Sequence, residues 1–370
     1  MDSVTRNTLS MKYLWTVPPK TSTDWVISGD GQMMKKEDAV ARIKEMDDTC
    51  VPFFTKEKFR EIGEQLKNVR NGSKTIQVKS LTGAVFEATV DLNNPYLYRL
   101  YKDPDPEPKE FVNLAVTIDY IHPERLLQYI EIEKSGSDIS AKGLLIPLQV
   151  VHEGYPVKRE DKTRKRDDVA ESFNHARIAW EASETCKIFK SVLSNNASGH
   201  KINKIVGFAC GSLAQSRLRA AFQHALLVTA KEWLENRDKQ LQDEAPTFYL
   251  QDPDYTTVDE EILAKDFGFK VVPEPDGFVE VDERSIVLSI APTVSIKYII
   301  AGIASPAIVI WLPMGEGEEA AQDPNTQGVL KMATEYNKHS FTDKEALGKE
   351  NFQQAVIYIR KKKDLKVRED

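Results

Sequence analysis

The chain has 370 residues, of which 41% are hydrophobic and 29% are charged, and its formal net charge at pH 7 is −7. This composition predicts a globular protein with a sizeable core, and because domains average about 150 residues the length favours two folded units or one elaborated unit. The negative charge repels polyanions, and acidic residues interrupt the most basic stretch, residues 158–166, so we expect no nucleic-acid partner.

The cysteines and the apolar runs indicate the cellular compartment of the protein. Cys50, Cys186 and Cys210 are widely spaced and form no CxxC pair, which favours a reducing compartment and predicts neither a disulfide framework nor a structural zinc site. The N-terminus has no apolar run of signal length, and the most apolar later run, 298–314, is broken by glycine, serine and proline. We therefore expect a cytoplasmic protein, with the nucleus as a second compartment and no membrane association.

The beginning of the chain predicts an arm followed by helices. Residues 1–34 are polar and interrupted by proline, and we expect a flexible arm there. Amphipathic patterns predict one helix over 35–46 and a second that begins after an N-cap at Thr55 and ends near Asn71.

The same N-terminal region, residues 35–160, also predicts β-structure. Apolar and polar residues alternate on both sides of Leu81-Thr82-Gly83, which is typical of a β-hairpin with a glycine-containing turn. The proline-rich run 103–108 cannot continue a β-ladder and predicts a stiff, extended loop. We expect an N-terminal α+β extension.

From residue 167 to the end, helical and strand patterns alternate. We expect one long helix over 167–193, a strand that ends in the sequence IVGFACGS, and a strong helix over 217–236. A helix after the second strand has an expected capping box from Thr257 to Glu260 and a C-terminal stop at Gly268.

The later strands are buried runs of isoleucine and valine without strict alternation, which is typical of parallel sheets covered on both faces. The crossover between the last two is expected to be the helix over 293–303. We therefore predict an α/β fold: a Rossmann-like, doubly wound, mostly parallel sheet over 167–370.

The turn after the first strand of this sheet is the candidate site. In doubly wound sheets a ligand binds beyond the carboxyl ends of the strands, where the strand order reverses. Glycine lets the backbone approach a ligand, free amides receive an anionic or polar group, and Asp252 is placed to accept hydrogen bonds from a ribose diol. The predicted cofactor-binding residues are Gly207, Ala209, Cys210, Gly211, Ser212, Gln223, Asp252, Pro292 and Thr293.

The motif is incomplete, and two interpretations stay open. GFACGS is neither GxGxxG nor a Walker loop, and it more nearly resembles the first turn of adenosylmethionine-dependent methyltransferases. On that interpretation the cofactor is adenosylmethionine or a nucleotide. On the other, Gly211 only relieves crowding between strand and helix, and Asp252 caps a turn with Pro253.

Other chemistry has weaker support in the sequence. Cys210 is a candidate nucleophile or soft ligand if a helix N-terminus lowers its pKa, and equally a small buried residue that fills the turn. The six histidines show no metal-binding spacing, so no metal site is predicted, and His224 is expected to be a satisfied helix histidine. No catalytic acid/base pair is evident.

The order of IVGFACGSL, a helix containing Gln223, the Asp252-Pro253 dipeptide and the helix end at Gly268 resembles the SRR-like domain, the family of the plant "sensitivity to red light reduced" regulators. The resemblance covers about residues 202–314, and the overall pattern is similar to the fungal branch. It departs from the family at Ala209-Cys210, and at the segment after the third long strand, which lacks the family's Pro-His-Cys.

The resemblance implies a regulatory protein with protein partners, of the light, circadian or developmental signalling type, on a Rossmann-like scaffold with a vestigial ligand pocket. The alternative is an adenosine-type cofactor binder or transferase. Haem regulation, known in some relatives, ranks third because the His-Cys that would support it is missing here. Oligomeric state and the identity of partners stay open.

Overall fold

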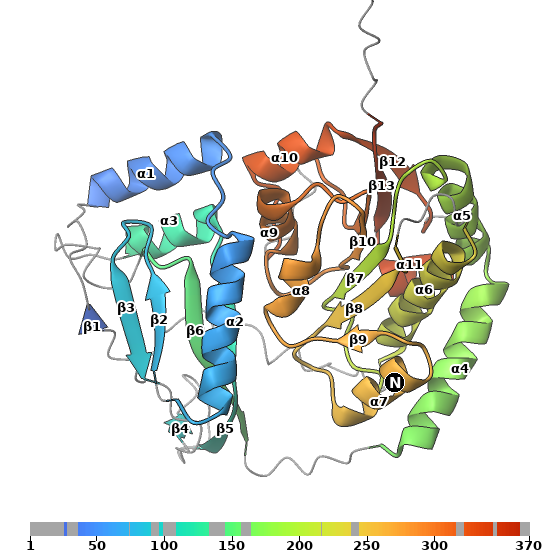
Figure 1. The fold of residues 1–370 in the computed structure, drawn as a ribbon, viewed down its shortest axis with the longest axis horizontal. Coiled ribbons are helices and arrows are strands. Elements are labelled where there is room, and N and C mark those ends of the chain that lie inside the picture. The colour runs from blue at the N-terminus through green and yellow to red at the C-terminus, as the bar shows by residue number, and fades with distance from the viewer. Residues whose placement is uncertain are drawn as a thin grey trace, which may run out of the picture.

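The structure is a computed structural model of the whole chain. It describes residues 26–27, 36–73, 75–89, 96–98, 109–132, 145–156, 164–215, 217–237, 244–315, 322–342 and 346–362. These form an N-terminal part, up to residue 156, and a C-terminal part, from residue 164, which lie side by side (Figure 1). The proline-rich run 103–108 and nearly all of the expected arm lie outside the described residues.

The N-terminal part holds two three-stranded antiparallel sheets, ordered β1-β3-β2 and β4-β5-β6, with three helices. The expected hairpin is confirmed, because β2 pairs with β3 around Gly83. The Thr55 hydroxyl accepts from the Lys58 amide, which confirms the N-cap. The elements are β1 Val26–Ile27, α1 Lys36–Asp48, α2 Lys56–Arg70, β2 Thr75–Lys79, β3 Val85–Thr89, β4 Tyr96–Tyr98, β5 Lys109–Tyr120, α3 Pro123–Ile132 and β6 Leu148–Pro156.

The C-terminal part holds a seven-stranded sheet ordered β12-β13-β11-β10-β7-β8-β9. The strands β7 to β11 are parallel to one another, and β13 runs antiparallel to both of its neighbours, β11 and β12. The predicted doubly wound, mostly parallel sheet is therefore confirmed. Its strands are β7 Lys204–Phe208, β8 Thr247–Gln251, β9 Lys270–Val271, β10 Ser285–Leu288, β11 Ile308–Trp311, β12 Tyr336–Ser340 and β13 Val356–Arg360.

Helices cover both faces of this sheet, and alternate residues of each strand enter different cores. Ile205 joins the core under α4, α5, α6 and α11, while Val206 and Phe208 join the core on the opposite face, under α8 and α9. The helices are α4 Arg166–Ala182, α5 Glu184–Val192, α6 Leu218–Glu235, α7 Thr257–Lys265, α8 Asp276–Glu280, α9 Ile296–Ile303, α10 Gln327–Ala333 and α11 Ala346–Phe352.

The long helix expected over 167–193 is wrong as a single element. The chain breaks at Ser183, whose backbone is extended at φ −75° and ψ 152°. The Ser183 hydroxyl accepts from the Cys186 amide, so this residue caps a new helix, α5. A serine hydroxyl competes well for exposed amides, which is why it starts α5 instead of continuing α4.

The capping box of α7 begins one residue earlier than predicted. Thr256, not Thr257, is the N-cap, and its partner at the third helical position is Asp259 instead of Glu260. Asp259 is buried whereas Glu260 is exposed, and only the buried carboxylate can also contact the rest of the fold. Gly268 ends the segment with φ +71°, as predicted.

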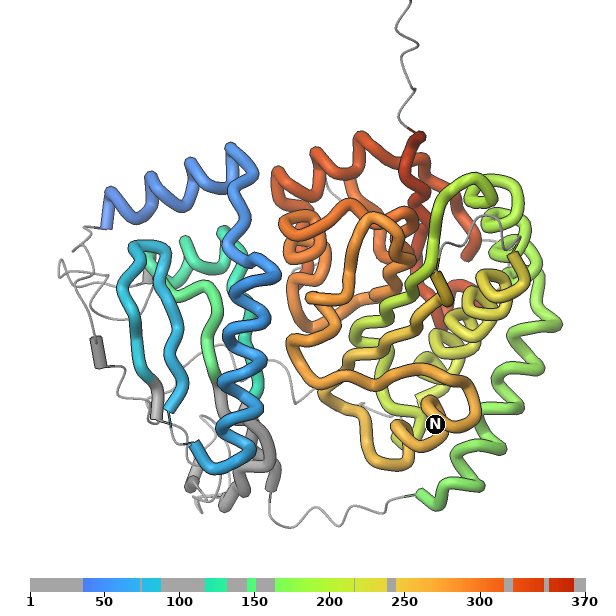
Figure 2. Tube along the Cα trace, in the orientation of Figure 1, coloured from blue at the N-terminus to red at the C-terminus, as the bar shows by residue number. Residues whose placement is uncertain are grey.

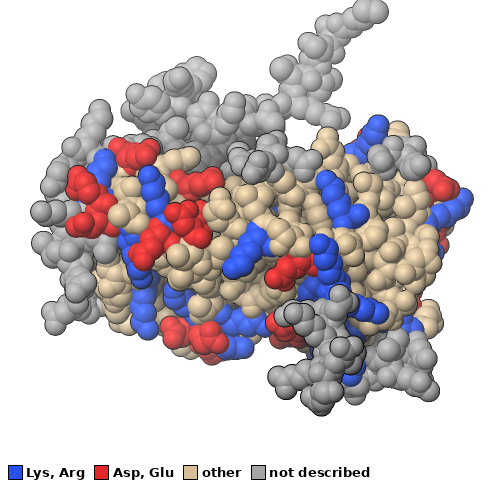
Figure 3. Space-filling view, turned by 90° about the horizontal axis from the view of Figure 1, so that it is seen from above, with Lys and Arg blue, Asp and Glu red and all other residues tan. Residues whose placement is uncertain are grey.

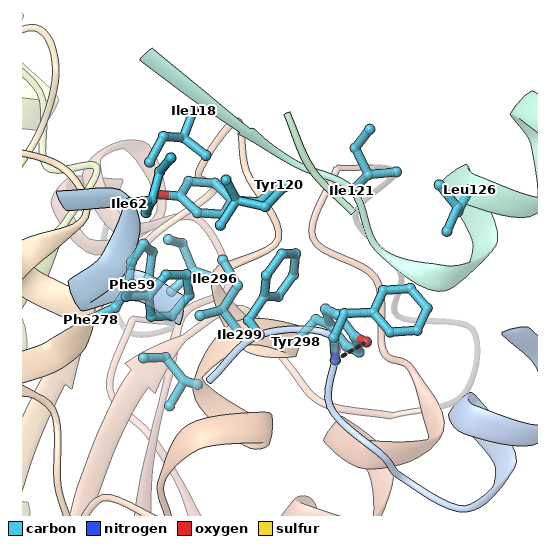
Figure 4. Packing of buried hydrophobic residues seen from close by; sticks show 14 of the residues in the cluster. Phe59, Ile62, Ile118, Tyr120, Ile121, Leu126, Phe278, Ile296, Tyr298 and Ile299 are labelled. Atoms are coloured by element: carbon cyan, nitrogen blue, oxygen red, sulfur yellow. Dashed lines mark hydrogen bonds between the residues drawn. The ribbon is translucent and has the colours of Figure 1, made fainter. Parts of the chain in front are cut away.

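The N-terminal part packs against one face of the sheet through a continuous hydrophobic core. Figure 2 shows the blue α2 beside the orange segments of α8 and α9. Phe59 and Tyr120 from the N-terminal part join Phe278 and Tyr298 from the C-terminal part in this core (Figure 4). The Tyr298 hydroxyl accepts from the Phe53 amide at 3.3 Å. The two parts therefore share one core.

Two glycines allow the parts to approach closely. A Cβ on Gly63 of α2 would lie 3.0 Å from Asp276 Oδ1, and a Cβ on Gly302 of α9 would lie 2.8 Å from Pro52 Cβ. Glu274 also accepts hydrogen bonds from the Thr117 hydroxyl at 2.8 Å. Side-chain packing and polar contacts thus hold the two parts together at the same interface.

Charges on the surface are mixed in sign. On the face in Figure 3, lysine and arginine side chains alternate with aspartate and glutamate among the described residues, without a broad region of one sign. No helix in the described part of the chain is long and apolar enough to cross a membrane.

Candidate functional site

The chain bends sharply after β7, as the sequence predicts. Ala209 has φ +53° and Gly211 has φ +78°, and α6 begins only at Leu218. A left-handed φ costs an ordinary residue about 1 kcal/mol or more, which explains the glycine at 211. The Ala209 amide donates to the carbonyl of Gln251 on β8, so the bend stays attached to the neighbouring strand.

Asp252, directly after β8, binds this bend. The Gly211 amide donates to Asp252 Oδ2 at 2.6 Å, and the Asp254 amide donates to Oδ1 at 2.8 Å. A ligand phosphate or carboxylate would need the same Gly211 amide. The protein's own carboxylate therefore occupies a donor that the sequence assigns to a ligand.

Burial affects the charge of Asp252. Desolvation raises the pKa of this carboxyl from 3.8 to about 6, although the hydrogen bonds from Asp254 and Gly211 act in the opposite direction. Each hydrogen bond from a backbone amide favours the charged carboxylate, and the loss of water disfavours it. Here the loss of water has the larger effect. Asp252 is thus an acid that titrates close to neutral pH.

A second carboxylate, Asp259 of α7, closes the rest of the turn. It is fully buried and accepts from the Ser212 hydroxyl at 2.7 Å, the Ala214 amide at 2.9 Å and the amide and hydroxyl of Thr256, each at 2.8 Å. Ser212 in turn accepts from the Gln215 amide at 3.3 Å. Asp259 was missed in the sequence because the capping box was placed one residue late.

His224 and Tyr255 form a buried pair next to these acids. His224 Nδ1 lies 2.7 Å from the Ala220 carbonyl and Nε2 lies 2.8 Å from the Tyr255 hydroxyl. Burial lowers the pKa of His224 to about 4, so the ring is neutral at physiological pH. The carbonyl requires a proton on Nδ1, and the tyrosine hydroxyl therefore donates to Nε2. Both ring nitrogens of this helix histidine therefore have partners, as expected.

Cys210 does not have the properties of an activated nucleophile. Its side chain is buried, and burial together with the Asp252 charge raises the pKa of the thiol well above its usual value. The expected lowering by a helix N-terminus is wrong, since α6 begins only at Leu218. Cys210 Sγ lies 3.7 Å from the Phe208 carbonyl and fills the turn.

Gly207 and Gln223 lie in the packed layer between β7 and α6. A Cβ on Gly207 would come within 2.7 Å of Leu250 and 2.9 Å of Leu227, so a larger residue there would have to displace these leucine side chains. Gln223 is buried, and its side-chain oxygen has no hydrogen-bond partner among the described residues. Buried side-chain amides normally have a hydrogen-bond partner, so this oxygen is an exception within the packed layer.

Pro292 and Thr293 follow β10, at the same edge of the sheet. Pro292 is buried and Thr293 is exposed, and no hydrogen bond connects either of them to the turn among the residues described. The structure therefore joins Gly211 to Asp252. Pro292 and Thr293 lie at the same edge of the sheet without a hydrogen bond to the turn among the described residues.

A buried polar cluster near Pro292 was not found from the sequence. The fully buried Lys297 donates through Nζ to Asn325 Oδ1 at 2.6 Å, and its amide donates to Asp323 Oδ1 at 2.8 Å. Burial raises the pKa of Asp323 to about 7, with the Lys297 charge opposing the shift. Because the cluster joins residues 26 and 28 positions apart, no local motif announces it.

The polar groups at the turn therefore form hydrogen bonds with one another. Asp252 and Asp259 take the amides of Gly211 and Ala214 together with the Ser212 hydroxyl. No group of three or more His, Cys, Asp or Glu side chains is placed to hold a metal ion in the part of the chain that the structure describes. A ligand at the turn would have to compete with two carboxylates.

The comparison with known proteins covers this whole sheet. Residues 185–359 match the family model described as the SRR1 domain, so the match begins in α5 and ends in β13. It extends further on both sides than the segment 202–314 that carries the resemblance in the sequence, and it includes the antiparallel last strand. No curated protein matches the chain. The chain therefore carries an SRR1 domain, which takes in all seven strands of the sheet.

Proposed function

We propose that this SRR-like protein is a regulatory protein that acts by binding other proteins, in light, circadian or developmental signalling, in the cytoplasm or the nucleus. The observation that carries the proposal is the internal closure of the turn after β7. Asp252 and Asp259 hold the donors that a Rossmann-like domain would otherwise offer to a cofactor. The sheet then serves as a scaffold, and a defined reaction is not required of it.

The test combines a ligand screen with reconstitution. Adenosylmethionine, ATP, NAD and haem are added at saturating concentration to the purified full chain, and the melting temperature is measured. Binding at 100 times Kd would stabilise the fold by about 2.7 kcal/mol, which is readily detected. We expect no shift, and we expect a purified partner, once identified in the native cells, to bind both the wild type and Asp252→Ala equally well.

A second candidate function is the binding of an adenosine-type cofactor, as in a transferase. Asp252 stands at the carboxyl end of the second strand, beside the glycine bend that follows the first, and the strand order reverses between β7 and β10. Doubly wound sheets bind ribose and phosphate at this place.

The two candidates give opposite results in the same screen. For a cofactor binder, adenosylmethionine or a nucleotide raises the melting temperature of the wild type, and Asp252→Ala abolishes the increase. Asp254→Ala is the matched control, because the Asp254 side chain lies beside the turn without a hydrogen bond to it among the described residues. Haem binding, the third candidate, predicts a Soret band on titration that Cys210→Ala weakens.

A further inference from the structure

A cavity of about 220 Å³ lies where the two parts of the molecule meet, away from the turn after β7. Its walls come from the end of α1 and the loop that follows, from the end of α9, and from α10. Because α9 runs back from the carboxyl end of β10 to the start of the parallel β11, its last residues lie near the amino ends of the strands, whereas Gly211 follows the carboxyl end of β7. The cavity is thus a separate site.

Cys50, one of the lining residues, has an unfavourable backbone. Its amide donates to the Asp47 carbonyl and the Val51 amide donates to the Met46 carbonyl, which is the Schellman arrangement that ends α1. Cys50 occupies the left-handed position of this motif, with φ +57°, where glycine is usual. A residue with a Cβ is strained in this conformation, so Cys50 has a cost in stability that glycine would not have.

The electrostatics of the cavity favour a positive charge. The carboxyl ends of α1 and α9 both contribute to its lining, and a helix carboxyl end carries about half a negative charge. Asp47 and Glu335 add two carboxylates, against the single ammonium of the exposed Lys331. Asp47 is partly buried and makes no ion pair among the described residues. Burial and, second, the neighbouring Asp48 raise the pKa of Asp47.

The remaining walls suit an apolar group. The Tyr298 ring is buried in the wall, and Met46 and Met332 are buried beside it. An aromatic face attracts cations, and methionine side chains adapt to apolar ligands of different shapes. The lining therefore combines acidic groups with an aromatic ring and apolar side chains.

We propose that this cavity binds a small organic cation, a protonated amine on a compact apolar group, with the ammonium beside Asp47 and the apolar group against Tyr298 and the two methionines. The volume limits the ligand. It exceeds the roughly 150 Å³ that accommodates benzene in an apolar cavity, and it is below the range of about 300 to 1,000 Å³ of drug-sized sites. A nucleotide is too large.

The ligand contacts both parts of the molecule at once. Met46, Asp47 and Cys50 belong to the N-terminal part, and Tyr298 and Met332 belong to the SRR1 domain. A molecule bound between them stabilises their interface, since it binds only when the parts are together. The site goes beyond the proposed regulatory function by giving it a chemical input, and it does not depend on whether the turn after β7 binds a cofactor.

The test compares an amine with its neutral counterpart on the full chain. Phenethylamine and 2-phenylethanol have the same ring and chain length, and only the first carries a positive charge at neutral pH. We expect isothermal titration calorimetry at low salt to give a Kd for the amine about tenfold or more below that of the alcohol, because a charge-assisted contact is added.

Three variants locate the site. Asp47→Asn should weaken amine binding about tenfold and leave alcohol binding unchanged, whereas Asp48→Asn, the exposed neighbour outside the lining, should change neither. Loss of a carboxylate at a helix carboxyl end does not harm α1, so both variants should fold. Gly328→Leu should abolish the binding of both compounds, because a Cβ there meets only Thr326 Oγ1, at 4.0 Å, and the side chain has room to fill the cavity.

Three results overturn the proposal. They are the absence of amine binding, equal affinity for amine and alcohol, and equal effects of Asp47→Asn and Asp48→Asn. Circular dichroism of each variant checks that its fold is retained. Asp252→Asn should leave amine binding unchanged, which separates this site from the one in the proposed function.

Discussion

Phe59 of α2 stacks on Phe278 of α8, with ring centroids 5.1 Å apart and an angle of 27° between the planes. The second face of Phe278 meets Phe208, the last residue of β7, at 4.7 Å and 16°. A column of three rings therefore runs from the centre of the parallel sheet into the N-terminal part. The strand that carries the glycine bend is packed, through one intervening ring, against a helix of the other part.

This column predicts that the two parts unfold together. Phe59 is fully buried, and Phe59→Ala should lower the free energy of unfolding by about 3–5 kcal/mol in urea denaturation. Hydrogen exchange of the β7 and β10 amides should accelerate in the same variant, although the substitution lies in the N-terminal part. If exchange in those strands stays at the wild-type rate while α2 is destabilised, the parts are independent folding units.

A second prediction concerns the left-handed Cys50. Glycine adopts a φ of +57° without steric cost, so Cys50→Gly should raise the free energy of unfolding by about 1 kcal/mol. Cys50→Ala keeps the Cβ and is the matched control, for which we expect no gain. Equal stability of the glycine and alanine variants in urea denaturation would contradict the strain assigned to this residue.

The central strands could be predicted because their sequences are unambiguous. β7, β10 and β11 are short runs of buried apolar residues between clear stop signals, and Gly211 marks the bend where it occurs. β12 has the sequence YNKHS, with only its first residue buried, and it carries too little apolar pattern to be recognised. It is a strand because it pairs with β13 in the folded protein, and the strand propensity of its residues does not predict this pairing.

The closure of the turn could not be predicted for a different reason. Asp259 and Ser212 are 47 residues apart, and their hydrogen bond depends on how α7 packs beside the bend. Likewise the apolar face of α2, with Phe59 and Ile62, predicts that something covers it but not that α8 does. Local pattern gives the elements, while contacts across long separations determine which polar groups remain for a ligand.

A third prediction follows from the four hydrogen bonds that Asp259 accepts. Asp259→Ala removes the capping box of α7 and leaves the Ala214 amide and the Ser212 hydroxyl without their partner. We expect a loss of about 3 kcal/mol or more in the free energy of unfolding, measured in urea. Asp254→Ala, in the same loop, should cost no more than about 0.5 kcal/mol.

Comparable losses in the Asp254→Ala and Asp259→Ala variants would show that Asp259 is not the group that holds the turn. A crystal structure of Asp259→Ala would then be expected to keep the bend at Gly211 in place. If our interpretation is right, the segment around Ser212 and Ala214 should instead show raised hydrogen exchange in that variant, because its two polar contacts to α7 are gone.

The last prediction uses the raised pKa of Asp252. The folded protein holds the proton up to about pH 6, whereas the unfolded chain releases it near 3.8. Between these values the folded state binds more protons, so the stabilising contribution of this group is complete below about pH 4 and is lost as pH rises through 6. Asp252→Asn cannot ionise and should escape this loss.

The measurement is the free energy of unfolding of wild type and Asp252→Asn from pH 4 to pH 7. Other groups titrate in both proteins and cancel in the difference, which should shift in favour of the variant by about 2 to 3 kcal/mol over this range. At the acidic end the variant should be the less stable of the two, since its amide group can accept from the Gly211 or the Asp254 amide but not from both through separate oxygens. A difference that is constant with pH would mean that Asp252 is charged in the folded protein throughout, and that the Gly211 amide stabilises the carboxylate more strongly than burial destabilises it.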